Sequence, residues 1–64
     1  MAPVCKLKAN LPTQEGRTLI VGTEVAVTDE FARAWNDVRL RIILVGEARY
    51  RVREEDLAYA WGGP

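Results

Sequence analysis

Apolar and polar residues alternate along the first part of the chain, as they do in strands that are buried on one side. In residues 4–11 one face would carry the apolar side chains of Cys5, Leu7, Ala9 and Leu11, and the other Lys6, Lys8 and Asn10. This period of two predicts a half-buried strand. Residues 12–16 contain proline and glycine and predict a turn. Residues 17–27 are rich in β-branched types and predict extended chain with a bend at Gly22.

A helical period follows these strands. Thr28 precedes two acids, which is typical of a helix start, because the hydroxyl caps the first turn and acids favour the positive end of the dipole. Apolar residues then recur at spacings of three and four, at Phe31, Ala34, Trp35 and Val38. The pattern predicts a helix over about 29–37 whose apolar stripe packs on the strands. Trp35 is interpreted first as a core anchor and only second as a binding residue.

Arginine stands at alternate positions at both ends of residues 39–53, RLRIILVGEARYRVR. The segment predicts a hairpin whose register depends on its loop. A two-residue loop would pair Val45 with Ala48 and divide the arginines between both faces. A loop of three or five residues would pair Val45 with Arg49 and gather the arginines on one face. Because burying an unpaired guanidinium is costly, we expect the odd-length loop.

The chain ends in a short helical signal followed by two aromatic residues. Residues 54–58, EEDLA, predict a helical turn that returns Leu57 to the core. Tyr59 and Trp61 come next, and we expect the tail 62–64 to be disordered or partly so.

Composition limits what such a chain can be. Sixty-four residues form one small domain, 1–64, with a limited core. A single cysteine and the lack of histidine leave no disulfide or usual structural zinc site within one chain, so self-association is a minority expectation. With no long apolar run and no signal-peptide pattern, we expect a soluble, cytoplasmic protein without membrane association.

The chemistry of the side chains argues against catalysis. Without histidine or serine, the usual general base and the serine nucleophile are missing, and Cys5 lies in a strand with no obvious activator. The acids Glu54, Glu55 and Asp56 are interpreted as the start of a helical turn instead of a metal site. We therefore predict a protein that is not an enzyme, with no catalytic residue, cofactor or metal.

The segment GTEVAV, the hairpin and the run RYRVREEDL resemble the small SH3-like β-barrels common in bacterial and phage proteins. In that family a strand opening with glycine precedes a variable loop, and a Tyr-x-Val run leads into a short helical turn. The resemblance covers residues 22–57 and implies a mainly β fold, either an SH3-like barrel or a strongly bent antiparallel sheet. It does not imply proline-peptide recognition, because the predicted helix replaces the loop that would carry that groove. The alternative is an open α+β sheet of the order ββαββ.

The predicted arginine face allows three interpretations. The first is a solvated face balanced by nearby acids, the second is a protein interface, and the third is a nucleic-acid surface. Equal numbers of basic and acidic residues and the adjacent acids argue against nucleic acid. We predict an accessory or regulatory, phage-type interaction module that binds a protein with an acidic surface, with weak nucleic-acid binding as the alternative. The predicted binding residues are Arg39, Arg41, Arg49, Arg51, Arg53, Tyr59 and Trp61.

Overall fold

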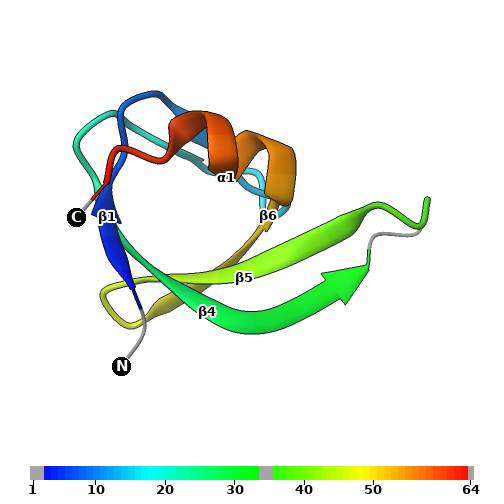
Figure 1. The fold of residues 1–64 in the computed structure, drawn as a ribbon. Coiled ribbons are helices and arrows are strands. Elements are labelled where there is room, and N and C mark those ends of the chain that lie inside the picture. Colours follow the sequence, from blue (N-terminus) through cyan, green and yellow to red (C-terminus); the bar gives the residue numbers. More distant parts are fainter. Residues whose placement is uncertain (1–2, 34–35, 64) are drawn as a thin grey trace.

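A computed structural model describes residues 3–33 and 36–63, and within them the fold is mainly β (Figure 1). The strands are β1 (Val4–Lys6), β2 (Leu11–Pro12), β3 (Thr18–Leu19), β4 (Glu24–Arg33), β5 (Arg39–Val45) and β6 (Ala48–Arg53), and helix α1 (Glu54–Ala60) follows. One antiparallel sheet has the order β1-β4-β5-β6, and β2 and β3 form a two-stranded sheet. The prediction of a mainly β fold is confirmed.

The four-stranded sheet bends around the core, and α1 lies across its open side (Figure 1). Hydrogen bonds join other segments to its two outer strands. The Gln14 N–H donates to the Arg51 carbonyl of β6 at 2.9 Å, and the Lys6 N–H of β1 donates to the Gly63 carbonyl at 3.2 Å. Strand pairing within the described residues does not run continuously around the molecule. The core contains Cys5, Leu7, Leu11, Leu19, Val25, Val27, Ile43, Val52, Leu57 and Ala60.

The alternation predicted for residues 4–11 is present as a burial pattern. Cys5, Leu7 and Leu11 are buried, whereas the two lysines between them are exposed. The segment forms two short strands and not one. Residues 17–27 are also divided, because a turn with Gly22 at φ 90° separates β3 from β4.

The helix predicted over 29–37 is wrong throughout the described residues, because β4 continues to Arg33 and residues 36–37 are not helical, with Asp37 at φ 65°. The Thr28 hydroxyl was expected to cap a helix, but it lies at an irregularity of β4 between Val27 and Phe31. There it donates to the Ile42 carbonyl at 2.7 Å and accepts the Glu30 N–H at 3.1 Å. Pairing with β5 supplies hydrogen-bond partners to the backbone of this segment. A short helix would have only its own backbone groups as partners and would be marginal in water. The alternative ββαββ order fails for the same reason, and Ala34 and Trp35 lie outside the described residues.

The register predicted for the β5–β6 hairpin is also wrong. Val45 pairs with Ala48, so the loop is the two-residue turn Gly46-Glu47, with Gly46 at φ 60°. Residues that pair across an antiparallel sheet share a face. Arg41 therefore shares a face with core residues such as Val52, while the other face carries the set that we call the outer row, consisting of Arg49, Arg51 and Arg53.

The divided register is tolerated because both faces of β5 are covered. Ile43 is buried in the core, and on the opposite face Leu40 and Ile42 are also buried. Arg49 on β6 forms an ion pair with Glu30 on β4, so its side chain crosses β5 on that face. The arginine stem covers apolar surface while its charge stays in solvent, and no buried side-chain nitrogen or oxygen in the described residues lacks a hydrogen-bond partner.

The helical turn predicted at 54–58 is confirmed and extends to Ala60. Three acids occupy its first turn, where they favour the positive end of the helix dipole. The expectation of a disordered tail over 62–64 is wrong for residues 62–63, and residue 64 lies outside the described residues. Trp61 forms a bridge with Leu7, and Gly63 accepts a hydrogen bond from β1, so the tail lies along the first strand.

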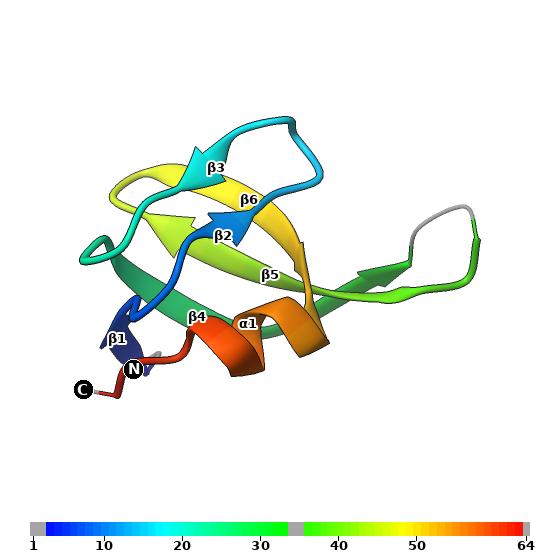
Figure 2. The ribbon, with the colours of Figure 1, turned by 90° about the horizontal axis from the view of Figure 1, so that it is seen from above.

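The β4–β5 pair extends beyond the rest of the sheet (Figures 1 and 2). We call this extension the arm and define it as residues 31–33 of β4 with residues 39–41 of β5. Phe31 pairs with Arg41 and Arg33 pairs with Arg39, so these four side chains share one face. This face, which we call the arm face, continues the core-facing side of the sheet into solvent.

Candidate binding surface

The five predicted hairpin arginines lie on two surfaces and not on one. Arg39 and Arg41 belong to the arm face, whereas the outer row occupies the opposite side of the sheet. Each surface therefore has to be judged by its own charges and contacts.

The outer row is balanced by carboxylates of the same chain. Three ion pairs neutralise it, joining Arg49 to Glu30 at 3.3 Å, Arg51 to Glu15 at 2.7 Å and Arg53 to Glu55 at 3.6 Å. Exposed pairs of this kind are screened and contribute little, about 0–1 kcal/mol each. The outer row has equal numbers of positive and negative charges, so it has little net attraction for an acidic partner.

Glu15 is the most firmly held of these carboxylates. It accepts the Arg51 N–H at 3.0 Å and the Arg51 Nε at 2.7 Å. Partial burial raises the pKa of Glu15, but these hydrogen bonds and the charge of Arg51 outweigh that effect and hold the pKa below its usual value. The pair fastens the loop between β2 and β3 to β6.

Arg41 is committed to contacts within the fold. Its Nε and Nη2 donate to Glu54 at 3.0 and 2.7 Å, and its Nη1 donates to the Thr28 carbonyl at 2.9 Å. The guanidinium also lies 4.1 Å from the centre of the Phe31 ring, and only 23% of the side chain is exposed. Arg41 therefore joins β4, β5 and the start of α1, and little of it remains for a partner.

Arg39 differs from the other four predicted arginines. Its guanidinium lies 4.0 Å from the centre of the Phe31 ring, and no ion pair within residues 3–33 and 36–63 includes it. Phe31 is 43% exposed, so the ring and the cation face solvent together. Arg33 stands beside them and is held by Asp37 at 2.7 Å. The arm face thus combines an exposed aromatic ring with a cation that lacks a carboxylate partner in the described chain.

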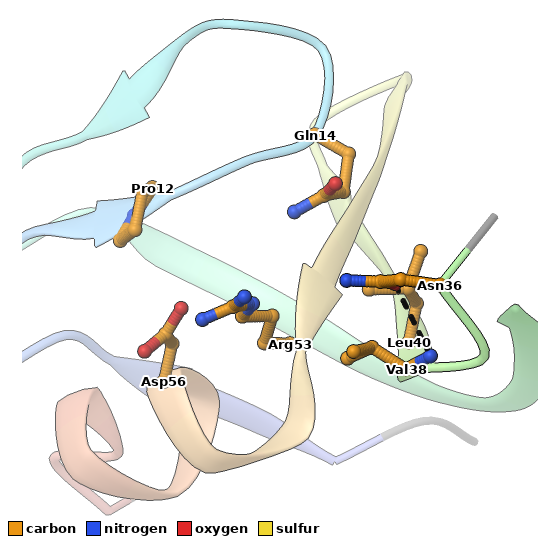
Figure 3. Close-up of a pocket in the computed structure, with 7 residues that line it drawn as sticks. All are labelled: Pro12, Gln14, Asn36, Val38, Leu40, Arg53 and Asp56. Carbon is orange, nitrogen blue, oxygen red and sulfur yellow. Dashed lines mark hydrogen bonds between the residues drawn. The ribbon is translucent and has the colours of Figure 1, made fainter. Parts of the chain in front are cut away.

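Two hollows lie near these residues. A wide one of about 410 Å³ borders the arm and is lined by Phe31, Ala32, Arg33 and Arg39. A smaller one of about 260 Å³ is lined by residues of β2 and the loop after it, of the β4–β5 loop, and of β5, β6 and α1 (Figure 3). Arg53 and Asp56 both line the smaller hollow, and their opposite charges give it no preference for an anion. The hollow at the arm carries cations without an acid in its lining.

The two predicted aromatic residues, Tyr59 and Trp61, differ in burial. Tyr59 on α1 is 73% exposed, whereas Trp61 is half-buried and packs against the core. The structure does not bring either into contact with the arm face through any described hydrogen bond or cation–π contact. Phe31 and Arg33 were missed as candidates because the sequence placed them in a helix.

Other chemistry finds little support in the described residues. Cys5 is a buried free thiol, and burial raises its pKa more than a backbone hydrogen bond at Gly62 lowers it. Within residues 3–33 and 36–63, no three metal-binding side chains gather in one place. No helix in that part of the chain has the length and apolar character needed to cross a membrane.

Comparison with protein-family models, curated proteins and solved structures gives no match for this chain. Its function is therefore inferred from the chemistry of its own surface.

Proposed function

We propose that the chain is a non-enzymatic interaction module that binds an acidic segment of another protein through the arm face. The observation that carries this proposal is Arg39, stacked on the exposed Phe31 ring and lacking a carboxylate partner among the described residues. An acidic side chain from a partner would supply the missing counterion.

The chemistry of the arm face suits a protein ligand. Arginine and aromatic side chains dominate the energetics of protein interfaces, because they combine apolar contact with directed hydrogen bonds. A guanidinium binds a carboxylate through two parallel N–H donors, and the Phe31 ring restrains Arg39 before the partner arrives. The neighbouring Arg33 adds a second cation that can exchange its exposed pair with Asp37 for a partner carboxylate.

For the fold, we propose an SH3-like barrel in which the arm is a long extension of one hairpin. The run of strands followed by a short helix before the last pairing at Trp61 supports this assignment. An accessory or regulatory role of the phage type, in the cytoplasm, belongs to the same proposal and rests on the resemblance alone.

Weak nucleic-acid binding is the second candidate, and Phe31 favours it. Both Arg39 and Arg41 lie over this ring, so a base would stack on Phe31 by displacing the exposed Arg39, whose guanidinium could then contact phosphate. The carboxylates of Asp37 and Glu54 already neutralise Arg33 and Arg41, so Arg39 is the one arginine of the arm face without an ion pair in the described residues. A single such cation suits one carboxylate of a protein better than a run of phosphates, whose binding depends on several cations.

A binding titration tests the proposal. A fluorescent oligo-glutamate peptide is titrated with wild-type protein, with Arg39→Glu and with the control Arg49→Glu from the outer row. We expect Arg39→Glu to weaken binding by about tenfold or more, because it replaces attraction with repulsion, and Arg49→Glu to change it by less than about threefold. Equal losses in both variants would contradict a site at the arm face.

A single-stranded oligonucleotide of the same length and charge serves as the competing probe. If it binds more tightly than the peptide, and its affinity falls linearly with salt on a log-log scale, the nucleic-acid candidate replaces the protein ligand. If neither probe binds wild-type protein at low salt, the proposed function is wrong.

A further inference from the structure

Among the described residues, the arm has an open strand edge. β4 pairs with β5 on one side, and on its other side β1 and the preceding Pro3 cover it as far as Val27, whose N–H donates to the Pro3 carbonyl at 2.7 Å. Beyond that point, no other described segment pairs with β4. An open edge presents unpaired backbone donors and acceptors to another chain.

The hydrogen-bond pattern shows which groups this edge presents. The Ile42 carbonyl accepts the Thr28 hydroxyl, so the backbone of Ile42 faces β4 and that of Arg41 faces β6. Arg51, which pairs with Ile42, is consistent with this orientation. Its N–H and carbonyl point away from β5 and bond residues of the β2–β3 loop. Phe31 pairs with Arg41 and therefore directs its N–H and carbonyl away from β5.

Arg33 lies two residues further along and has the same orientation as Phe31. The open edge thus presents two donors and two acceptors in a row, with the spacing of an antiparallel partner strand.

The charges along this edge are complementary to those of a second, antiparallel copy of the same edge. When two antiparallel copies of residues 29–33 are paired about a two-fold axis at Phe31, Arg33 of one copy stands opposite Asp29 of the other. Glu30 then stands opposite Ala32, and Phe31 opposite Phe31. No two like charges face each other, and both ends of the pairing carry opposite charges.

We propose that a second copy of this chain pairs with the β4 edge in this register. The pairing joins two arms into one four-stranded ribbon with both arm faces on the same side. Phe31 of the second copy completes the surface beside Phe31 of the first, and the ribbon offers two copies of Arg39 to one acidic partner. This consequence rests on the proposed function, whereas the pairing itself does not.

The contact is small, because the regular edge of the arm comprises only residues 31–33, and Asp29 and Glu30 lie in the irregularity of β4 between Val27 and Phe31. The contact of Arg33 with Asp29 of the other copy is therefore one between side chains beyond the regular backbone pairing. Interfaces well below about 1,200 Å² are weak and transient, so we expect a concentration-dependent dimer. Sedimentation velocity from about 10 μM to about 1 mM should then show a rising average mass.

A charge exchange tests the register. Arg33→Asp places two acids opposite each other at both ends of the pairing, so we expect the dimer dissociation constant to rise by about tenfold. The double variant Asp29→Arg with Arg33→Asp restores opposite charges and should recover the wild-type constant. Lys8→Asp makes the same change of charge at an exposed site on another surface and should have little effect.

A backbone variant tests the edge itself. Arg33→Ala and Arg33→Pro both remove the side chain, but only proline removes the outward N–H, which β5 does not use. We expect the proline variant to associate more weakly than the alanine variant at an unchanged melting temperature. A protein that stays monomeric at about 1 mM, or a double variant that fails to recover association, overturns the dimer. Peptide binding by a monomeric protein would leave the proposed function intact, so the two failures are distinguishable.

Discussion

At the scale of single residues, Arg41 shows how one side chain can unite segments that are distant in the sequence. Its guanidinium bonds Glu54 at the start of α1 and the Thr28 carbonyl in β4, and it lies against Phe31. A planar group with five donors suits this position, because three of its nitrogens donate to Glu54 Oε1 and the Thr28 carbonyl while the group lies over the Phe31 ring. The sequence pattern marked Arg41 as exposed, and the structure gives it a role in the fold.

Arg41→Lys should therefore lower the free energy of unfolding by about 1–2 kcal/mol, since an ammonium cannot keep all of these hydrogen bonds. Arg39→Lys is the matched control on the same strand and face, and we expect it to cost less than about 0.5 kcal/mol because Arg39 is exposed. Urea denaturation followed by tryptophan fluorescence measures both values. Equal losses would show that the contacts of Arg41 are not stabilising.

Glu15 gives the protein a predictable response to acid. Its pKa is lowered in the folded state, so the stability it contributes is present above its unfolded pKa, near 4.5, and is lost as the pH falls through the folded value. Glu15→Gln should be less stable than wild type at pH 6 by up to about 1 kcal/mol, because the pair with Arg51 is half exposed. The difference should shrink below about pH 4. A constant difference in urea unfolding between pH 3 and pH 6 would contradict this assignment.

At the scale of elements, short sequence patterns in this chain are compatible with both a helix and a strand, and pairing with a distant strand determines which one forms. Thr28 followed by acids fits a helix cap, but its hydroxyl satisfies the backbone equally well at an irregularity in a strand. Phe31 fits a helical stripe and also a strand opposite Arg41. The choice depends on whether β5 is long enough to pair with the segment, and local periodicity does not contain that information.

The hairpin register failed for a related physical reason. The cost of a buried guanidinium was assigned to every arginine on the core-facing side, but Arg41 lies at the end of that side and finds Glu54 there. Gly46 adopts a positive φ that suits a tight two-residue turn. The alternation at Cys5 and Leu7 was predictable because burial on one side leaves a direct period in the sequence.

The junction of the tail with β1 is an element whose strength can be tested at one glycine. A Cβ atom at Gly62 would overlap the Lys6 carbonyl, which is backbone and cannot move aside. Gly62→Ala should lower the free energy of unfolding by about 1–3 kcal/mol and loosen the tail. Hydrogen exchange of the Lys6 and Lys8 amides, which donate to Gly63 and Ala60, should accelerate more than that of β5 amides. Uniform acceleration would contradict a local effect.

At the scale of the whole molecule, the fold balances most of the hairpin arginines with carboxylates and leaves Arg39 without an ion pair among the described residues. The outer row is neutralised by acids that come from three different segments of the chain, and this arrangement depends on the fold. The sequence indicated that arginines are important here, but it could not indicate which of them lack a partner. That distinction required the positions of Glu15, Glu30 and Glu54 in space.

The labelling rate of the buried thiol of Cys5 reports how peptide binding stabilises the whole folded molecule. The thiol is 1% exposed and lies in β1, and its pKa is raised by burial, so a thiol reagent reaches it only when the structure opens. If that opening is global unfolding, an acidic peptide that binds only the folded state should slow labelling in proportion to its saturation. At a peptide concentration of about 100 times the dissociation constant, labelling should slow about hundredfold.

The Gly62→Ala variant separates global from local opening. In this variant the tail is displaced from β1, so local opening should label Cys5 quickly even when peptide is bound at the distant arm face. In wild-type protein, labelling that rises with denaturant and falls with peptide shows that binding is coupled to the whole fold. A different result would contradict preferential binding to the folded chain. In that result, saturating peptide does not slow the labelling of Cys5 in wild-type protein, although the labelling rate still follows global unfolding.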